Sequence, residues 1–322
     1  MINLKYPAKG ETVRIITDKQ KAFLEMDRKG MTADSIDWLN LERQAKEDES
    51  FPLSVKFVWD AERIGTLYLS ETEDFKDFIK VRGDKTCSVT NLKAATRYFW
   101  KVKCGKEESE VSFFDTECIL PRWIFIEGLT NVRDVGGWIC GEKRMKQGIF
   151  YRGSELNSHV NITKNGLKTM KDGLKIKSVL DLRGSTELVR DIYKREYINI
   201  PVRAYSEFFD EPERVREVFS YLAKEENYPI YMHCWGGADR TGTIALLLQA
   251  LLGADIKDIL DDYEITTLSI WGVRSRNTEL FLGTIKRLDE FSGKNIQEKT
   301  EKFLLSCGVT KEEIEKIREI YL

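Results

Sequence analysis

One short stretch of the sequence combines a thiol, two glycines and an arginine at a spacing suited to nucleophilic attack on a bound anion. Residues 231–243 read YMHCWGGADRTGT, and the apolar run 244–252 follows. This pattern predicts a strand, a glycine-containing loop and a helix. A helix N-terminus presents unpaired N–H donors and about half a positive charge, so a loop that enters one suits a phosphate dianion. The same field favours the thiolate form of a cysteine, which makes Cys234 the candidate nucleophile.

The other residues of this loop supply hydrogen-bond donors. Arg240 can fold back over the loop and hold two phosphate oxygens through its planar guanidinium, a geometry that lysine lacks. Gly236 and Gly237 allow the backbone to curl so that successive N–H groups point inward at the anion. The predicted phosphate-binding set is Trp235, Gly236, Gly237, Ala238, Asp239 and Arg240. We expect His233 to orient the loop by hydrogen bonding, and Thr241 to donate to the thiolate.

The loop and three stretches upstream of it resemble a known family. The order His-Cys, five residues, Arg and then Thr-Gly resembles the signature of cysteine-dependent protein tyrosine and dual-specificity phosphatases. The longer form HCWGGADRTG is similar to the loop HCxxGKDRTG of the bacterial tyrosine/serine phosphatases. The upstream stretches that match this branch are NVRDVGG at 131–137, YRGSEL at 151–156 and VLDLRGSTE at 179–187. The resemblance covers roughly residues 124–322.

The resemblance implies a phosphomonoester hydrolase that needs no cofactor and no metal. Cys234 would form a phosphocysteine intermediate that water hydrolyses, while Arg240 and the loop amides hold the phosphate. The leaving alkoxide or phenoxide must be protonated, and the resemblance assigns this general-acid role to the aspartate before the arginine, here Asp239. Asp210, in the segment FFDEP, is the alternative general acid, because it lies where a mobile loop would follow a strand.

One residue departs from the family pattern, since Ala238 stands where the lysine is expected. Loss of this cation disfavours substrates with a second phosphate, so a phosphoinositide or inositol-phosphate phosphatase is the weaker alternative. We expect phosphotyrosine in a protein as the substrate, with phosphoserine, phosphothreonine or a small phosphoester as alternatives. A catalytically silent phosphate-binding module remains a further alternative, against which the intact Cys234, Asp239 and Arg240 argue. Trp235 either stacks on an aromatic substrate or packs on neighbouring structure.

The second half of the chain alternates apolar strands with helical segments. We predict strands at 178–182, 198–201 and 229–233, which favours an α/β domain at 119–322 with a central, mostly parallel sheet flanked by helices. Charged residues near these strands either touch substrate or hold loops in place. We expect the structural role for them, because charged pairs at the ends of buried strands are usually structural. They are Arg133, Asp134, Asp181, Arg183 and Glu187.

The first half has the alternating pattern of an all-β domain. In residues 51–116, apolar side chains recur at every second position, and turn residues separate the runs. The segment 91–98, Asn-Leu leading to Thr-x-Tyr98, resembles the tyrosine corner of immunoglobulin-like sandwiches, and the whole looks like a fibronectin type III domain. We predict this domain at 1–118, with a helical insertion that comprises 18–29 and 35–46.

The amino-acid composition disfavours several classes of partner, location and metal site. The 322 residues include 51 basic and 53 acidic side chains, a net charge of −2, which disfavours a nucleic-acid partner. There is no run of about 18 uncharged apolar residues, and the chain opens without the apolar segment of a secretory signal. Six cysteines without a CxxC pair and only two histidines argue against a disulfide scaffold and a His-rich metal centre. We expect a cytoplasmic protein with free thiols, with a secreted or surface location as the alternative if a signal peptide was removed. No partner is predicted for the first domain.

Overall fold

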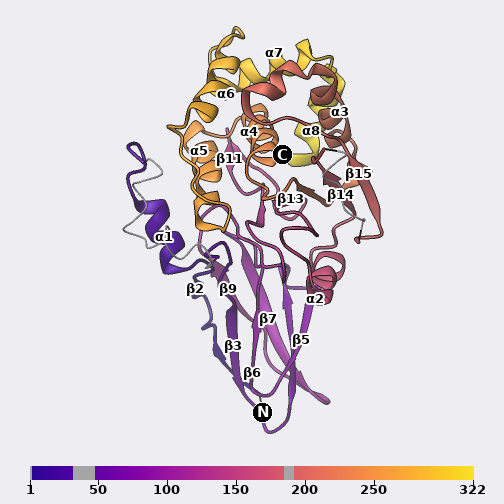
Figure 1. Ribbon diagram of the computed structural model, residues 1–322. Coiled ribbons are helices and arrows are strands. Elements are labelled where there is room, and N and C mark those ends of the chain that lie inside the picture. The colour runs from indigo at the N-terminus through magenta and orange to yellow at the C-terminus, as the bar shows by residue number, and fades with distance from the viewer. Residues whose placement is uncertain (1, 32–47, 185–191) are drawn as a thin grey trace. The chain divides into compact units, whose positions relative to one another are not determined.

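The computed structural model describes residues 2–31, 48–184 and 192–322 (Figure 1). The predicted helix at 35–46 and the candidate Glu187 lie outside the described residues. Within these residues the chain forms two compact units. The first contains residues 2–17 and 52–122, and the second contains residues 18–31, 48–51 and 123–322 apart from the gap.

The first unit consists of two sheets whose apolar faces contact each other. One sheet has the order β1-β3-β6, with β1 Asn3–Tyr6, β3 Val55–Asp60 and β6 Thr86–Val89. The other has the order β2-β9-β7-β4-β5, and β8 also pairs with β7; its bounds are β2 Thr12–Val13, β9 Ser112–Thr116, β7 Arg97–Cys104, β4 Gly65–Ser70, β5 Ile79–Gly83 and β8 Glu107–Glu108. The rings of Phe57 on β3 and Trp100 on β7 lie 5.2 Å apart, so side chains from both sheets share one core.

Tyr98 makes a hydrogen bond to the backbone at the turn that leads into β7. The Tyr98 hydroxyl accepts a hydrogen bond from the backbone N–H of Lys93 at 2.9 Å. The ring is buried and stacks on Phe114 of β9, and this burial raises the pKa of Tyr98 to about 12. Because the buried Tyr98 hydroxyl accepts a hydrogen bond from a backbone N–H earlier in the chain, it fixes the turn that leads into β7.

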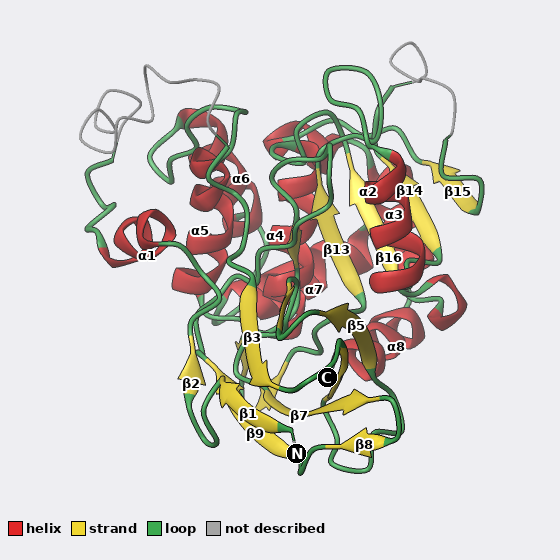
Figure 2. Ribbon diagram, turned by 90° about the horizontal axis from the view of Figure 1, so that it is seen from below, coloured by secondary structure: helices red, strands yellow, loops and turns green. Residues whose placement is uncertain are grey.

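The second unit contains a five-stranded sheet with the order β10-β13-β16-β14-β15. Its strands are β10 Arg133–Asp134, β13 Phe150–Gly153, β16 Ile230–His233, β14 Ser178–Asp181 and β15 Glu196–Asn199. All neighbours are parallel except the pair β10 and β13, so the predicted mostly parallel sheet is confirmed. Figure 2 shows β13, β16 and β14 beside one another, with β15 beyond β14. The sequence analysis did not identify β10 and β13 as strands.

The helices of the second unit either pack on the two faces of this sheet or pack on other helices. They are α1 Asp18–Glu25, α2 Lys164–Lys168, η2 Thr169–Gly173, η4 Tyr205–Asp210, α3 Pro212–Leu222, η5 Glu225–Asn227, α4 Arg240–Leu252, α5 Ile256–Glu264, η6 Ile265–Leu268, α6 Glu279–Asp289, α7 Ile296–Ser306 and α8 Lys311–Tyr321. A hairpin of β11 Ile139–Cys140 and β12 Lys143–Arg144 lies between β10 and β13 in the chain. On one face Tyr151 and Tyr231 pack with Met170 of η2, and on the other Phe150 contacts Tyr321 of α8. The central strand β16 is therefore covered on both faces.

Residues 18–31 and 48–51 belong to the second unit, although the first unit's residues lie before and after them in the chain. Arg28, just after α1, is buried and pairs with Asp261 and with Glu264 of α5, the latter at 3.1 Å. The Ser50 hydroxyl accepts a hydrogen bond from the Asn131 N–H at 2.8 Å. The sequence analysis placed residues 18–29 in an insertion of the first domain. In the structure the buried Arg28, which follows this helix, pairs with two carboxylates of α5 in the second unit.

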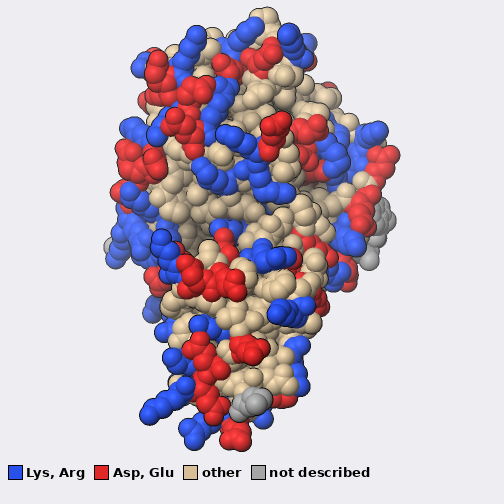
Figure 3. Space-filling model, turned by 180° about the vertical axis from the view of Figure 1, so that it is seen from behind, with Lys and Arg blue, Asp and Glu red and all other residues tan. Residues whose placement is uncertain are grey.

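The described surface carries both signs of charge. On the face drawn in Figure 3, Lys and Arg side chains are interspersed with Asp and Glu side chains. All six cysteines are described and are free thiols. None of the described helices is long and apolar enough to cross a membrane.

We predict that Tyr98→Phe lowers the free energy of unfolding of the first unit by about 1–2 kcal/mol, because the Lys93 N–H then lacks its buried acceptor. Chemical denaturation followed by circular dichroism measures this change. Tyr68→Phe on β4 is the matched control, since no hydrogen bond of its hydroxyl is found among the described residues, and it should change stability by less than about 0.5 kcal/mol. Equal effects of the two substitutions would contradict the role of the corner.

Candidate active site

The predicted nucleophile lies at the edge of the sheet where the parallel strands end. Cys234 directly follows β16, and its residue is only 3% exposed. The helix α4 begins at Arg240, so residues 234–239 form a loop between strand and helix, as predicted. Gly153 of β13 and Asp181 of β14 both pair with His233 in register. The residues that follow all three strands therefore meet around this loop.

Every carbonyl of residues 234–239 is held by a donor outside the anion-binding side of the loop. The acceptors at its centre are Gly236 O, which binds Asn131 Nδ2 at 2.8 Å, and Gly237 O and Ala238 O, which bind Arg152 Nη2 at 2.7 and 3.2 Å. Around them, Cys234 O lies 2.9 Å from His233 Nδ1, Trp235 O 2.7 Å from Glu155 N, and Asp239 O 2.8 Å from Thr243 N. The orientation of each peptide unit in the loop is thus fixed.

The N–H groups of the same peptide units are left for a ligand. In a trans peptide the N–H and C=O groups point in opposite directions, so carbonyls bound to the scaffold turn the N–H groups of residues 235–239 away from it. No described residue accepts a hydrogen bond from these N–H groups. Together with the N-terminus of α4 they form a nest of donors, the arrangement that binds a phosphate.

A buried ion cluster stands behind the loop. Asp262 of α5 accepts from Arg152 at 2.6 Å and from Arg133 at 2.8 Å, and all three side chains are buried. Burial would raise the pKa of Asp262, but the Arg133 and then the Arg152 guanidinium lower it, so the carboxyl is ionised. Burial, with repulsion from Arg152, lowers the pKa of Arg133 to about 10. Arg133 thus holds the loop indirectly, the structural role expected for it.

A second cluster supports the loop from the side of β14. Arg183 pairs with Asp181 at 2.7 Å and with Glu155 at 2.8 Å. His233 is buried 3.8 Å from Asp181. Burial lowers the pKa of His233 despite the opposing effect of Asp181, so its ring is neutral at pH 7. Because a carbonyl oxygen only accepts, His233 Nδ1 carries the proton and donates to the Cys234 carbonyl at 2.9 Å.

Both glycines of the loop are required by close packing. A Cβ on Gly236 would lie 2.4 Å from the Trp271 ring. Gly237 has φ +64°, and a Cβ there would lie 2.1 Å from the backbone oxygen of Gly153. The loop backbone therefore lies directly against β13 and against the Trp271 ring, and no side chain fits between them.

Asp239 is bound by two residues that the sequence analysis did not identify. Arg274 donates through Nε and Nη2 to the two carboxylate oxygens at 2.8 and 2.9 Å, and the Tyr205 hydroxyl donates to Oδ1. Burial would raise the pKa of Asp239, but the bidentate Arg274 outweighs it and holds the pKa below its ordinary value. Tyr205 has φ +57°, a left-handed conformation that places its side chain at the loop. Neither residue lies in a recognisable motif.

The alternative acid Asp210 lies at the end of η4, and its side chain is 54% exposed. Its carboxylate pairs with Arg287 of α6 at 2.9 Å. Tyr205, at the start of the same short helix, is the residue that reaches Asp239. The structure thus places Asp239 in the loop and Asp210 at the far end of the element that contacts it.

The remaining predicted residues lie at the two ends of the loop. The Arg240 guanidinium lies over the Trp235 ring, 5.3 Å from its centroid. The Thr241 hydroxyl is buried and makes no hydrogen bond to a described residue, the Cys234 sulfur included, which leaves its O–H available as a donor. Ala238 is buried, so no cation extends from this position.

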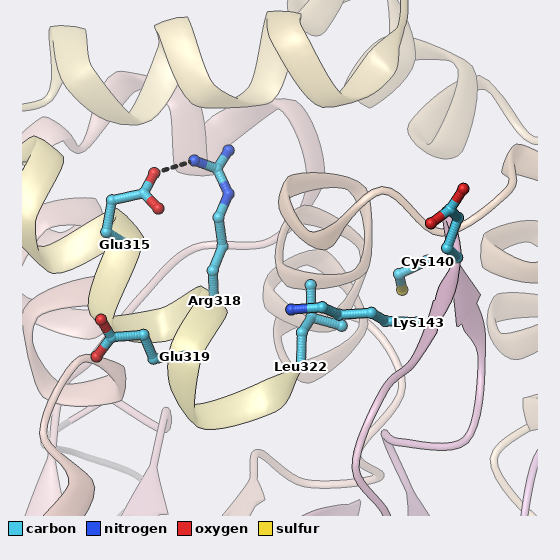
Figure 4. Close-up of a pocket in the computed structure, with 7 residues that line it drawn as sticks. Cys140, Lys143, Glu315, Arg318, Glu319 and Leu322 are labelled. Carbon is cyan, nitrogen blue, oxygen red and sulfur yellow. Dashed lines mark hydrogen bonds and ion pairs between the residues drawn. The ribbon is translucent and has the colours of Figure 1, made fainter.

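Hollows elsewhere on the second unit are not part of this arrangement. One hollow, of about 490 Å³, lies between the β11–β12 hairpin and α8. Cys140, Lys143 and Arg318 are among its lining residues (Figure 4). It contains no residue of the loop 234–240. Among the described residues, no group of three or more His, Cys, Asp or Glu side chains is placed to hold a metal ion.

The comparison with protein families agrees with the geometry of the loop. The model of the tyrosine phosphatase family matches residues 124–322, more than half of the chain. The chain belongs to the tyrosine phosphatase family. Members of this family are cysteine-type phosphatases, so the chain is a hydrolase of phosphoesters. The family resemblance stated from the motif HCWGGADRTG is confirmed at this level.

A solved structure, the core catalytic domain of the PP-IP phosphatase SIW14 from S. cerevisiae in complex with citrate, is similar with 15% identity and a TM-score of 0.31. The match covers 49% of this chain and 84% of that one. No protein with a curated description matches the chain.

We predict that Gly237→Ala displaces the loop and abolishes its binding of vanadate, a phosphate analogue, because the new Cβ meets the Gly153 carbonyl. Gly105→Ala is the matched control, since Gly105 has the same φ of +64° and no neighbouring atom within 4 Å of the methyl group that the substitution adds. The control should lose only the roughly 1 kcal/mol cost of the left-handed backbone. Calorimetric titration with vanadate and denaturant unfolding measure both effects. Unchanged vanadate binding by Gly237→Ala would contradict the close approach.

Proposed function

We propose that the protein is a protein tyrosine phosphatase that acts through a phosphocysteine intermediate on Cys234, with phosphoserine as a possible second substrate class. One observation carries this proposal: all six carbonyls of residues 234–239 are bound by surrounding groups, which leaves the loop N–H groups for a phosphate. Cys234 begins this nest of donors and Arg240 ends it. A binding module would need the donors but not the thiol.

The reaction has two displacements at phosphorus. The Cys234 thiolate attacks, an S–P bond forms, and the P–O bond to the tyrosine oxygen breaks while that oxygen takes a proton from a carboxylic acid. Water then attacks phosphorus, the S–P bond breaks, and phosphate and the thiolate are released. The loop N–H groups and the Arg240 guanidinium bind the phosphoryl oxygens, on which charge is spread in both transition states. The buried Thr241 hydroxyl is available to stabilise the departing thiolate.

Asp239 is the proposed general acid, and its surroundings set when it carries the proton. In the free protein Arg274 keeps it ionised. A phosphate dianion bound in the adjacent loop adds negative charge beside the carboxylate and thereby favours its protonation. Proton uptake at Asp239 is thus coupled to substrate binding. Asp210, paired with Arg287 at 2.9 Å, remains the alternative acid.

The substrate class follows from the loop and its neighbours. Ala238 offers no cation for a second phosphate, which supports a phosphomonoester of a protein over an inositol polyphosphate. The form HCWGGADRTG supports the tyrosine/serine branch of the family. We place the protein in the cytoplasm, because a nucleophilic thiol stays reduced there.

We further propose that the first unit is a fibronectin type III-like sandwich. Its two sheets, with Phe57 and Trp100 in a shared core, and the Tyr98 corner support this assignment. A spacer role is the simplest one for such a domain.

We predict that the protein releases phosphate from a phosphotyrosine peptide in the presence of EDTA and that Cys234→Ser abolishes this release. The serine hydroxyl is not ionised at neutral pH and cannot replace the thiolate. A panel of phosphotyrosine, phosphoserine and phosphothreonine peptides, phosphoinositides and phytate ranks the substrates. Cys307→Ser, on a partly buried thiol after α7, is the control and should retain full activity. Release that persists in Cys234→Ser, or that EDTA abolishes, would contradict the mechanism.

We predict that Asp239→Asn lowers kcat on a phosphotyrosine peptide by roughly 10²-fold or more, the usual contribution of a general acid. Asp210→Asn should change it less than twofold. On p-nitrophenyl phosphate, whose leaving group needs no proton, the defect of Asp239→Asn should shrink. The opposite ranking of the two variants would assign the acid to Asp210.

The pH–rate profile gives a second test of the same assignment. Arg274 lowers the pKa of Asp239, so Arg274→Met should raise it. Because a general acid works only when protonated, activity falls as the pH rises through this pKa. Arg274→Met is therefore expected to move the basic limb of kcat, which reports the acid in the substrate complex, to higher pH. A limb that stays in place, with the enzyme folded, would show that Asp239 is not the acid.

A further inference from the structure

Three aromatic side chains from distant parts of the chain meet beside the phosphate loop. The His159 ring lies 5.1 Å from the Trp235 ring and 6.2 Å from the Trp271 ring. Trp235 belongs to the loop itself, His159 follows β13, and Trp271 follows η6. We call Trp235, Trp271 and His159 the aromatic rim.

The rim is fixed to the loop by contacts that leave little freedom. Trp271 packs on Gly236 so closely that no Cβ fits between them. One oxygen of Glu155 accepts from the His159 N–H at 2.6 Å and lies 2.7 Å from His159 Nδ1. The Glu155 N–H binds Trp235 O at 2.7 Å, and its other carboxylate oxygen pairs with Arg183. A single buried carboxylate therefore sets the position of His159 relative to the loop.

The rim is open to a ligand. Trp235 is 40% exposed, a large fraction for an indole, and the His159 side chain is 52% exposed. Arg240, which binds phosphate in the proposed function, lies over the face of the Trp235 ring at 5.3 Å. The phosphate donors of the loop and the exposed Trp235 and His159 side chains are thus neighbours.

We infer that the aromatic rim receives the phenyl ring of phosphotyrosine and that Trp235, Trp271 and His159 determine specificity for it over phosphoserine. This inference rests on the proposed function, since the phosphate must occupy the loop. A phenyl ring attached to that phosphate reaches aromatic faces with which it can stack or make edge contacts. Phosphoserine has no ring and gains nothing from the rim. The rim supplies affinity for the substrate and takes no part in bond breaking.

The test compares two peptides of identical sequence that carry either phosphotyrosine or phosphoserine. Trp235→Ala and His159→Ala should each lower kcat/KM for the phosphotyrosine peptide by roughly three- to tenfold, the range expected for one aromatic contact. For His159→Ala the loss should appear in KM, with kcat and the phosphoserine reaction little changed. Because the Trp235 ring lies against Arg240, the readout for Trp235→Ala is the ratio of kcat/KM between the two peptides, which should fall by the same factor. Trp271→Phe, which keeps the packing on Gly236, should have a smaller effect in the same direction. Phe125→Ala is the control, an aromatic residue 38% exposed that packs on Phe51 and should leave both reactions unchanged.

The possible outcomes separate the inference from the proposed function. Equal losses on both peptides, or none, would overturn the inference while the phosphatase reaction stands. No phosphate release from either peptide by the unaltered protein would instead overturn the proposed function. Calorimetric binding of the two peptides to Cys234→Ser repeats the comparison without turnover. A phosphotyrosine preference that Trp235→Ala removes there supports the rim, and equal binding of both peptides refutes it.

Discussion

The site depends on the hydrogen bonds from Arg152 to two carbonyls of the loop. A guanidinium buried beneath Gly237 and Ala238 fixes the peptide units that present N–H groups to the anion. The charge of Arg152 can stay buried there because Asp262 pairs with it and with Arg133. Asn131 extends this network to Gly236, since its amide oxygen accepts from Arg133 and its amide nitrogen donates to the loop. The buried side chains beneath the loop thus fix its N–H groups in the orientation that binds an anion before the anion arrives.

The order of the strands explains why the supports come from both sides. The strand β16, which leads into the loop, lies between β13 and β14, and all three run parallel. Their carboxyl ends lie at the same edge of the sheet. Arg152 on β13 and Asp181 on β14 therefore lie on either side of the loop, and no long connecting segment is needed to bring them there. An edge strand would have offered a neighbour on one side only. The central position is therefore what allows a short loop to be held from both flanks.

The parts of the site that sequence could predict are those encoded locally. The loop 234–240 lies between a strand and a helix whose patterns are distinct, so its spacing alone indicated an anion site. Arg274 and Tyr205 could not be found this way, because each lies more than thirty residues from Asp239 and only the fold brings them together. The strand β13 was missed because its sequence, FYRG, ends in an arginine and a glycine and so lacks the apolar run that indicated β14 and β16.

The same reasoning applies to the domain organisation. The alternation in the first half indicated its strands, and the Tyr98 motif indicated the turn into β7. The segment around α1 was grouped with those strands because it precedes them in the chain. Its attachment to α5 depends on Arg28 meeting Asp261 and Glu264, a pairing across more than two hundred residues that no local pattern encodes. The roles assigned to Cys234, Asp239 and Arg240 remain predictions that their placement supports.

The close packing of the two loop glycines also bears on how this enzyme can evolve. Backbone and ring atoms occupy the space beside Gly236 and Gly237, so neither position can accept a side chain without moving β13 or Trp271. Variation that retunes the substrate is therefore confined to residues whose side chains point away from the scaffold, Trp235 first among them. The loop divides into positions that are sterically closed to mutation and positions that are open to it. A library aimed at new specificity is best built at position 235 and at the rim residues around it.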